Sequence, residues 1–155
     1  MNGEGADVTT VLFSRVREGR DLPAPQRATA AAAGFDLRAR VDGAVEIAPG
    51  ERAMVPTGII LALPEGFEAQ VRPRSGLAWK RGLTVLNAPG TVDSDYRGEI
   101  RVLLVNLGRE PVQVSRGDRV AQLIVQRLPE IVLRESEELP GSARGAGGFG
   151  HTGDR

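Results

Sequence analysis

The sequence predicts an all-β fold of short strands, because three features agree. The chain has 155 residues, a length typical of one domain with a substantial core. It contains 20 glycines and 10 prolines, residue types that turns use. Between them lie short apolar runs, as in strands that enter a core. A single domain of strands joined by turns follows from these features.

Each apolar run predicts a strand, and each glycine or proline cluster predicts the turn that ends it. The run at residues 52–63 is the longest, and we expect an edge or bulge at Pro56 and Gly58 because proline lacks a backbone N–H. Residues 21–33 form a linker rich in proline and alanine, with room for a little helix. The expected strands cover residues 8–16, 33–39, 45–47, 52–63, 67–71, 83–86, 99–105, 111–114 and 119–128.

One short helix is expected at residues 75–80. Pro73 interrupts the preceding strand, and Ser75 is a residue type that caps helices. A helix N-terminus presents unpaired N–H groups and a partial positive charge, to which Arg74 adds a full charge. The segment is therefore either a seat for phosphate or a helix that Ser75 simply caps.

A polar segment at residues 90–98 lies between the strands expected at 83–86 and 99–105, so it forms the tip of a β-hairpin. Asp93, Asp95, Tyr96 and Arg97 lie close together there, between two glycines that permit a tight turn. Such a tip is either an ordinary solvated turn or a site that combines carboxylates with a phenol and a guanidinium.

Two further polar residues lie within expected strands. Asp36 alternates with apolar neighbours, so it faces either solvent or a cleft in which it could hold a cation. Gln122 interrupts the apolar strand at 119–128, where an amide is either exposed by the pleat or hydrogen-bonded in a site.

Charge and composition exclude several classes of function. Lys+Arg and Asp+Glu both number 20, which gives no bias toward nucleic acid or membrane partners. There are no cysteines, so disulfides and thiolate metal sites are excluded. His151 is the only histidine, which disfavours a histidine metal site or a Ser-His-Asp triad. Without a leader or a membrane-spanning run, a soluble cytoplasmic protein is expected.

The last part of the chain differs from the rest. We expect a core at residues 1–132 and a flexible C-terminal arm at 133–155. Residues 141–153 contain six glycines around Arg144 and Phe149. A glycine-rich tail is usually a linker, but here its backbone could approach phosphate while the arginine binds it and the aromatic ring stacks on a base.

Five segments together resemble the motifs of the trimeric dUTPase family, in order and at family-like spacing. They are AGFDLRA at 33–39, PRSGLAWK at 73–80, GTVDSDYRGEI at 90–100, RGDRVAQLIVQ at 116–126 and GSARGAGGFGHTG at 141–153. The resemblance implies a homotrimer of distorted jelly-roll subunits, whose active sites lie between subunits and are closed by the arm. It also implies that dUTP is hydrolysed to dUMP and pyrophosphate with Mg²⁺, which removes dUTP from the nucleotide pool and supplies dUMP for thymidylate synthesis.

The hairpin carries the implied catalytic base and the nucleoside pocket. Asp93 would be the general base for water that attacks the α-phosphorus. Tyr96 would pack under the deoxyribose and leave no room for a 2′-hydroxyl. Asn87 and the hairpin backbone at Thr91 and Val92 would read uracil.

The other implied residues hold the triphosphate or close the site. Asp36 would reach Mg²⁺ through the water shell of the metal, which the triphosphate oxygens mainly hold. Arg144 would bind the γ-phosphate, and the arm at Gly148 and Phe149 would cover the uracil. The phosphate-binding residues on a neighbouring subunit would be Arg74, Ser75, Gly76 and Gln122.

Two rival interpretations remain at this point. The dCTP deaminases share the fold but carry a catalytic glutamate on the strand after the hairpin tip, where this chain has Leu103 in an apolar run. A non-catalytic trimeric jelly roll would keep the fold while losing the Asp93 carboxylate or the arm, and this sequence has both.

Overall fold

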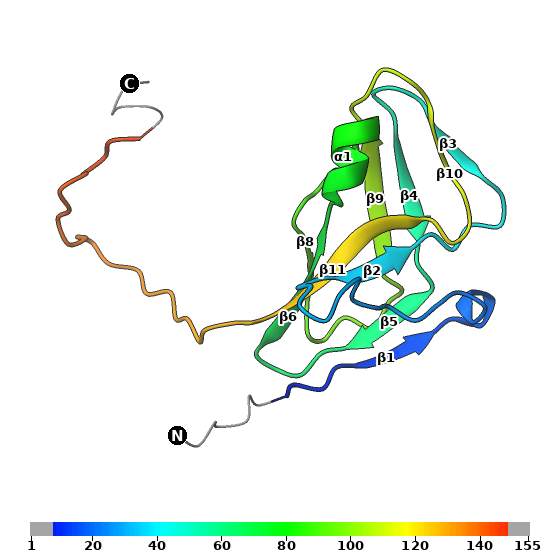
Figure 1. The fold of residues 1–155 in the computed structure, drawn as a ribbon. Helices are drawn as coiled ribbons and strands as arrows, with labels where there is room; N and C mark the ends of the chain where they lie inside the picture. The colour runs from blue at the N-terminus through cyan, green and yellow to red at the C-terminus, as the bar shows by residue number, and fades with distance from the viewer. Residues whose placement is uncertain (1–7, 149–155) are drawn as a thin grey trace.

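The computed structural model describes residues 8–148 and confirms an all-β chain with one short α-helix (Figure 1). A single turn of 3-10 helix, η1, also occurs within this range. The elements are β1 (Leu12–Arg15), η1 (Arg17–Gly19), β2 (Phe35–Arg38), β3 (Val45–Ile47), β4 (Arg52–Pro56), β5 (Ile59–Ala62), β6 (Phe67–Arg72), α1 (Ser75–Arg81), β7 (Leu83–Val85), β8 (Gly90–Val92), β9 (Arg101–Asn106), β10 (Val112–Val114) and β11 (Arg119–Arg127).

The strands form four small antiparallel sheets. The largest has the order β2-β11-β6-β8, and a second has the order β4-β9-β7. Two further pairs, β1-β5 and β3-β10, complete the set. Neighbours in these sheets are mostly distant in sequence, so the strands cross between layers rather than following one another as a meander.

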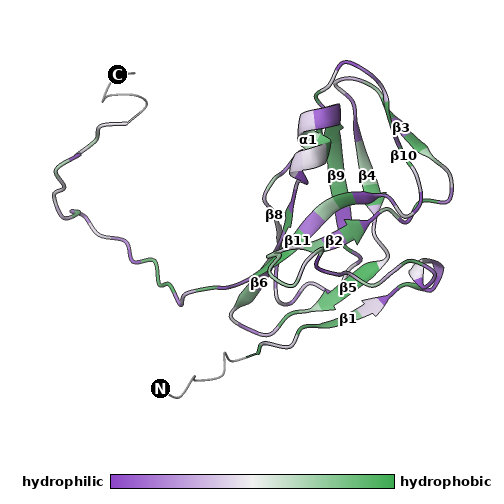
Figure 2. Cartoon of the chain, viewed as in Figure 1, coloured by the Kyte–Doolittle hydropathy of each residue, from purple (hydrophilic) through white to green (hydrophobic). Residues whose placement is uncertain are grey.

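The core lies between the sheets and is built from alternating side chains. In β9 the residues at alternate positions are buried, and the strand becomes almost wholly buried toward its end, as its apolar sequence predicts. Figure 2 shows the hydrophobic residues concentrated in the strands, while α1 is pale or hydrophilic. The largest fully buried side chains are Leu37, Ile47, Val55, Val102, Leu104, Val114 and Asn106.

Several element boundaries differ from the prediction. The first strand is shorter than expected, and the helical turn at Arg17–Gly19 precedes the 21–33 linker, which contains no helix. The interruption expected at Pro56 and Gly58 is confirmed, since β4 ends at Pro56 and β5 begins at Ile59. Gly58 adopts a positive φ of 75° at this break, which favours glycine.

The hairpin tip was predicted to be a polar segment without a strand of its own, and the structure differs. Strands β7 and β9 do pair with each other as expected. The tip, however, contains β8, which pairs with β6 in the other sheet, with Gly90 opposite Val71 and Val92 opposite Ala69. The catalytic candidates that follow β8 therefore rest on a strand anchored in the four-stranded sheet.

Helix α1 begins at Ser75, one residue before the start that a Ser75 cap would require. Its N-cap is Arg74, and the structure shows no side-chain cap hydrogen bond, so the alternative in which Ser75 caps the helix is wrong. The helix ends at Arg81, and the C-cap residue Gly82 has a left-handed φ of 66°. Within residues 8–148 no helix is long and apolar enough to cross a membrane.

Candidate active site

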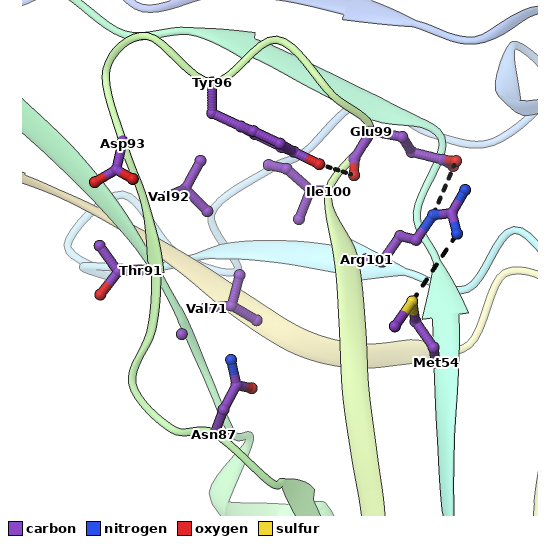
Figure 3. Close-up of a pocket in the computed structure, with 11 residues that line it drawn as sticks. Met54, Val71, Asn87, Thr91, Val92, Asp93, Tyr96, Glu99, Ile100 and Arg101 are labelled. Atoms are coloured by element: carbon purple, nitrogen blue, oxygen red, sulfur yellow. Dashed lines mark hydrogen bonds and ion pairs between the residues drawn. The ribbon is translucent and has the colours of Figure 1, made fainter.

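A pocket of about 310 Å³ lies between β8, the tip that follows it and the start of β9 (Figure 3). Its size suits a small-molecule ligand. Five of the predicted site residues line it: Asn87, Thr91, Val92, Asp93 and Tyr96. Gly90, one of the two glycines that bound the tip, also lines it, and the sequence analysis did not single out the other five: Met54, Val71, Glu99, Ile100 and Arg101.

The floor of the pocket is held by β8. Its pairing with β6 fixes Gly90 against Val71, and a Cβ added at Gly90 would lie 3.2 Å from Nδ2 of Asn87. Glycine at this position therefore allows the Asn87 amide to lie close to the strand backbone. The side-chain amide and the backbone edge together offer hydrogen-bonding groups to a planar base.

Asp93 lies at the end of β8, at the side of the pocket opposite Arg101 in Figure 3. The N–H of Tyr96 donates to the carbonyl of Asp93 at 3.2 Å, which closes the turn. The side chain of Asp93 is exposed. Within residues 8–148 its carboxylate has neither a hydrogen bond nor an ion pair, so both oxygens are available to water or ligand.

Tyr96 extends across the pocket from the tip toward β9 (Figure 3). Its hydroxyl donates to the backbone carbonyl of Glu99 at 3.1 Å. Its ring lies so close to Gly98 that a Cβ there would collide with the ring and the hydroxyl. The ring position therefore depends on the backbone at residues 98 and 99.

Glu99, unlike Asp93, is fully engaged. Arg40 donates to its carboxylate from Nε at 3.0 Å and from Nη2 at 3.3 Å, and the Gly58 N–H donates at 2.7 Å. Burial acts to raise the pKa of Glu99, but the hydrogen bonds from Arg40 and the Gly58 N–H outweigh it and hold the pKa below its ordinary value. Glu99 is therefore an ionised structural partner rather than a free base.

A second cluster contains the predicted phosphate and metal residues, and it does not line this pocket. Asp36 Oδ1 lies 3.3 Å from Arg74 Nε, and Asp36 Oδ2 accepts a hydrogen bond from Arg119 at 3.2 Å. Gln122 donates to the carbonyl of Pro73 at 3.0 Å and so holds the turn before the helix. Sequence reasoning missed Arg119, although it lies in the RGDRVAQ motif.

The ligand set around Asp36 suits only one mode of Mg²⁺ binding. No group of three or more His, Cys, Asp or Glu side chains that could hold a metal occurs among residues 8–148. Both Asp36 oxygens already contact guanidiniums. Magnesium commonly keeps several waters and binds through few carboxylates plus substrate phosphates, and a single carboxylate could take part only in that mode.

Two of the predicted arm residues, Arg144 and Gly148, lie in a described segment that leads away from the sheets. The segment after β11 contains no helix or strand up to residue 148, and Figure 1 shows it leading away from the sheets. Arg144 Nε donates to the carbonyl of Gly147 at 2.7 Å, within the same segment as Gly148. Phe149 and His151 lie outside the described residues.

Comparison with known proteins gives the family. The dUTPase family model matches residues 20–153. Deoxyuridine 5′-triphosphate nucleotidohydrolase of Caulobacter vibrioides (strain NA1000 / CB15N) is 56% identical over 145 residues, covering 92% of this chain and 94% of that protein. The protein of the same name from Rhizobium rhizogenes (strain K84 / ATCC BAA-868) is 54% identical over 146 residues, covering 93% and 94%.

Solved structures support the fold. The dUTPase of Staphylococcus bacteriophage 80alpha with dUPNHPP superposes with a TM-score of 0.79 at 23% identity, covering 94% of this chain and 99% of that one. A dUTPase from phage phi11 of S. aureus, described with a structural Mg(II) ion, gives a TM-score of 0.74 at 22% identity, covering 83% and 97%.

The chain has the jelly-roll-like β fold of these solved structures, with a pocket beside β8. The chain belongs to the dUTPase family. It is thus an enzyme, a dUTP diphosphatase, and neither the deaminase nor the non-catalytic alternative is supported.

Proposed function

We propose that the enzyme hydrolyses dUTP to dUMP and pyrophosphate, with Asp93 as the general base for water that attacks the α-phosphorus. One observation carries the proposal: two carboxylates line the pocket, and only Asp93 is free, because Glu99 is bound by Arg40 and Gly58. A carboxylate without a bound partner can accept a proton from water.

General-base catalysis supplies only part of the rate. Such a base contributes roughly 10²–10⁴ in rate, so positioning of the triphosphate and neutralisation of its charge must supply the rest. Arg74 is suited to that task because Asp36 and the carbonyl of Arg119 fix its guanidinium at Nε and Nη1. An arginine held in this way loses little side-chain entropy when it binds phosphate.

The pocket is proposed to bind the nucleoside. The Asn87 amide and the backbone of Thr91 and Val92 would pair with uracil, and Tyr96 would lie against the deoxyribose. Cytosine exchanges the donor and acceptor of uracil and would leave buried polar groups unpaired, which can discriminate strongly. The methyl group of thymine can be excluded only sterically, by a rigid β8.

The phosphates are proposed to lie near the start of α1, contacted by Arg74, Ser75 and Gly76, with Gln122 holding Pro73 in place. Asp36 would hold Mg²⁺ through water. When bound, the metal would supply positive charge to the triphosphate. Arg144 would bind the γ-phosphate, and Gly148 and Phe149 would cover the base as the 133–155 arm closes over the 1–132 core.

We also propose that the sites are shared between the subunits of a homotrimer. Among residues 8–148, the nucleoside pocket and the Arg74 cluster do not line a common cavity, and Figure 1 shows residues 133–148 leading away from the sheets. Large apolar side chains are also exposed, as at subunit interfaces. They include Met54, Leu86, Leu107, Ile131, Val132, Leu133 and Leu139.

This activity has a direct test. Pyrophosphate release is measured from dUTP with Mg²⁺ beside dCTP, dTTP and UTP, and ammonia release is followed from dCTP. Release of pyrophosphate from dUTP with little from the others supports the proposal and fits an enzyme of the cytoplasmic nucleotide pool. Ammonia from dCTP, or no turnover of any nucleotide, would contradict it.

A further inference from the structure

The Glu99 carboxylate is mostly buried and receives several hydrogen bonds. Its side chain is only 12% exposed and receives three hydrogen bonds, two from Arg40 and one from the Gly58 N–H. In addition, Arg101 Nε lies 3.9 Å from Glu99 Oε2. A carboxylate with several donors in a partly buried setting is held much more firmly than an exposed ion pair.

These contacts join the pocket to segments that are distant in sequence. Arg40 follows β2, and Gly58 lies at the break between β4 and β5. Adjacent backbone contacts continue the junction, since the Ile100 N–H donates to the carbonyl of Ile59 at 2.8 Å and Thr57 Oγ1 donates to the carbonyl of Ile100 at 2.7 Å. The chain immediately after the hairpin tip is thereby fixed to the β4–β5 break.

Arg40 packs closely against the backbone at the break between β4 and β5. A Cβ added at Gly58 would lie 3.0 Å from Arg40 Cδ and 3.3 Å from the Cα of Gly19. Glycine at residue 58 therefore lets the arginine stem pass close to the backbone while its guanidinium reaches Glu99. The arrangement is a packed junction, not a chance surface pair.

Glu99, whose side chain is held by Arg40 and Gly58, also fixes Tyr96 through its backbone. The Tyr96 hydroxyl donates to the backbone carbonyl of Glu99, and its ring lies against Gly98. Figure 3 shows the ring extending along the pocket toward Glu99. A shift of Glu99 would therefore move the surface on which a sugar would rest.

We propose that Glu99, held by Arg40 and the Gly58 N–H, is a positioning residue that fixes the Tyr96 ring and thereby sets rejection of nucleotides that carry a 2′-hydroxyl. The inference rests on the sugar-packing role proposed for Tyr96. A steric filter discriminates only while its wall is rigid, because a wall that yields admits the larger ligand at low cost. Loosening the junction should therefore benefit UTP more than dUTP.

A purely structural role for Glu99 makes a different prediction. It would lower stability and reduce turnover of both nucleotides in the same proportion. The ratio of kcat/KM for dUTP to kcat/KM for UTP separates the two roles, because loss of folded enzyme cancels from it.

The test compares that ratio in wild-type enzyme, Glu99→Gln and the matched control Asp21→Asn. Asp21 is also a carboxylate held by an arginine, with its Oδ1 2.7 Å from Arg116 Nη2, but it does not line the pocket. We expect Glu99→Gln to lower the ratio about tenfold or more, a change in the range of steric discrimination. Asp21→Asn should leave the ratio unchanged.

A second variant covers the case in which Glu99→Gln does not fold. Tyr96→Phe removes the hydrogen bond to the Glu99 carbonyl and keeps the ring, and it should lower the same ratio in the same direction. If Glu99→Gln and Tyr96→Phe, or whichever of them folds, keep the ratio within about twofold of wild type, this inference is overturned while the proposed function stands. Wild-type enzyme that does not hydrolyse dUTP would overturn both this inference and the proposed function.

Discussion

At the scale of single residues, carboxylates near the proposed site differ in what they contact. Asp36 contacts two guanidiniums, and Glu99 is held by Arg40 and Gly58. Asp93 has no such partner in the described part of the chain. This difference, more than motif position alone, is why we assign the base to Asp93.

Replacing Asp93 by Asn should lower kcat for dUTP by roughly 10²–10⁴, because an amide cannot accept the proton from water. Binding of a non-hydrolysable dUTP analogue should be retained, since the amide is nearly isosteric. Asp95→Asn is the matched control, because Asp95 is also exposed but does not line the pocket. Equal losses in the two variants, measured as pyrophosphate release, would contradict the assignment.

Asp93, Tyr96 and Asn87 lie close together along one hairpin and line one pocket, while their proposed roles come from the family resemblance. The sequence could not predict that Glu99 contacts Arg40, which is 59 residues away, or that Arg119 contacts Asp36 across 83 residues. Such contacts follow from which strands pair, and a local pattern does not encode that pairing.

At the scale of elements, the Glu99 junction should make stability depend on pH. The pKa of Glu99 lies below its ordinary value of 4.5 in the folded chain. Its contribution is therefore fully present above that value and is lost as the pH falls through the lower, folded-state pKa.

Glu99→Gln should thus lower the free energy of unfolding at neutral pH by roughly 1–3 kcal/mol, the cost of leaving partly buried donors poorly paired. The difference from wild type should shrink as the pH falls well below 4.5. Denaturant titrations of both proteins across this range measure it. A difference that does not change with pH would show that the charge of Glu99 does not stabilise the fold.

The end of α1 provides a second test at this scale. A Cβ added at Gly82 would lie 2.5 Å from the Cα of Gly108, and φ there is 66°. Gly82→Ala should therefore cost roughly 2–5 kcal/mol, from the left-handed conformation and the collision together.

Gly66→Ala is the matched control, because φ there is 77° and nothing lies within 4 Å of the added Cβ. It should cost only about 1–2 kcal/mol. Thermal or denaturant unfolding of both variants gives the comparison. Similar losses in the two would mean that the contact between Gly82 and Gly108 is unimportant.

Elements were predictable where an apolar run is bounded by glycine or proline, as at β3, β6 and β10. Strand β8 was missed because it has three residues inside a segment rich in polar turn formers. Its strand conformation comes from pairing with β6, so tertiary contact overrides local preference.

At the scale of the whole molecule, one chain carries the parts of the proposed site in separate places. The pocket with Asp93, the Arg74 cluster and the segment with Arg144 would come together only between subunits. Assembly would then be required for activity. Local sequence patterns do not give such an arrangement, which here comes from the family resemblance and agrees with the separation of the parts in the fold.

The most direct test of this account mixes two inactive variants. One is Asp93→Asn with an intact arm, and the other keeps Asp93 but lacks residues 141–155. Described residues 133–148 make no hydrogen bond or ion pair to the sheets, so the truncated core should fold. The two are co-expressed with different tags, and assemblies carrying both tags are purified.

If hairpin and arm come from different subunits, every trimer that carries both tags has one site in three that combines an intact hairpin with an intact arm. The purified mixed assemblies should therefore recover about a third of wild-type dUTP hydrolysis. Mixed assemblies that remain as inactive as the separate variants would contradict the shared site with Asp93 as its base.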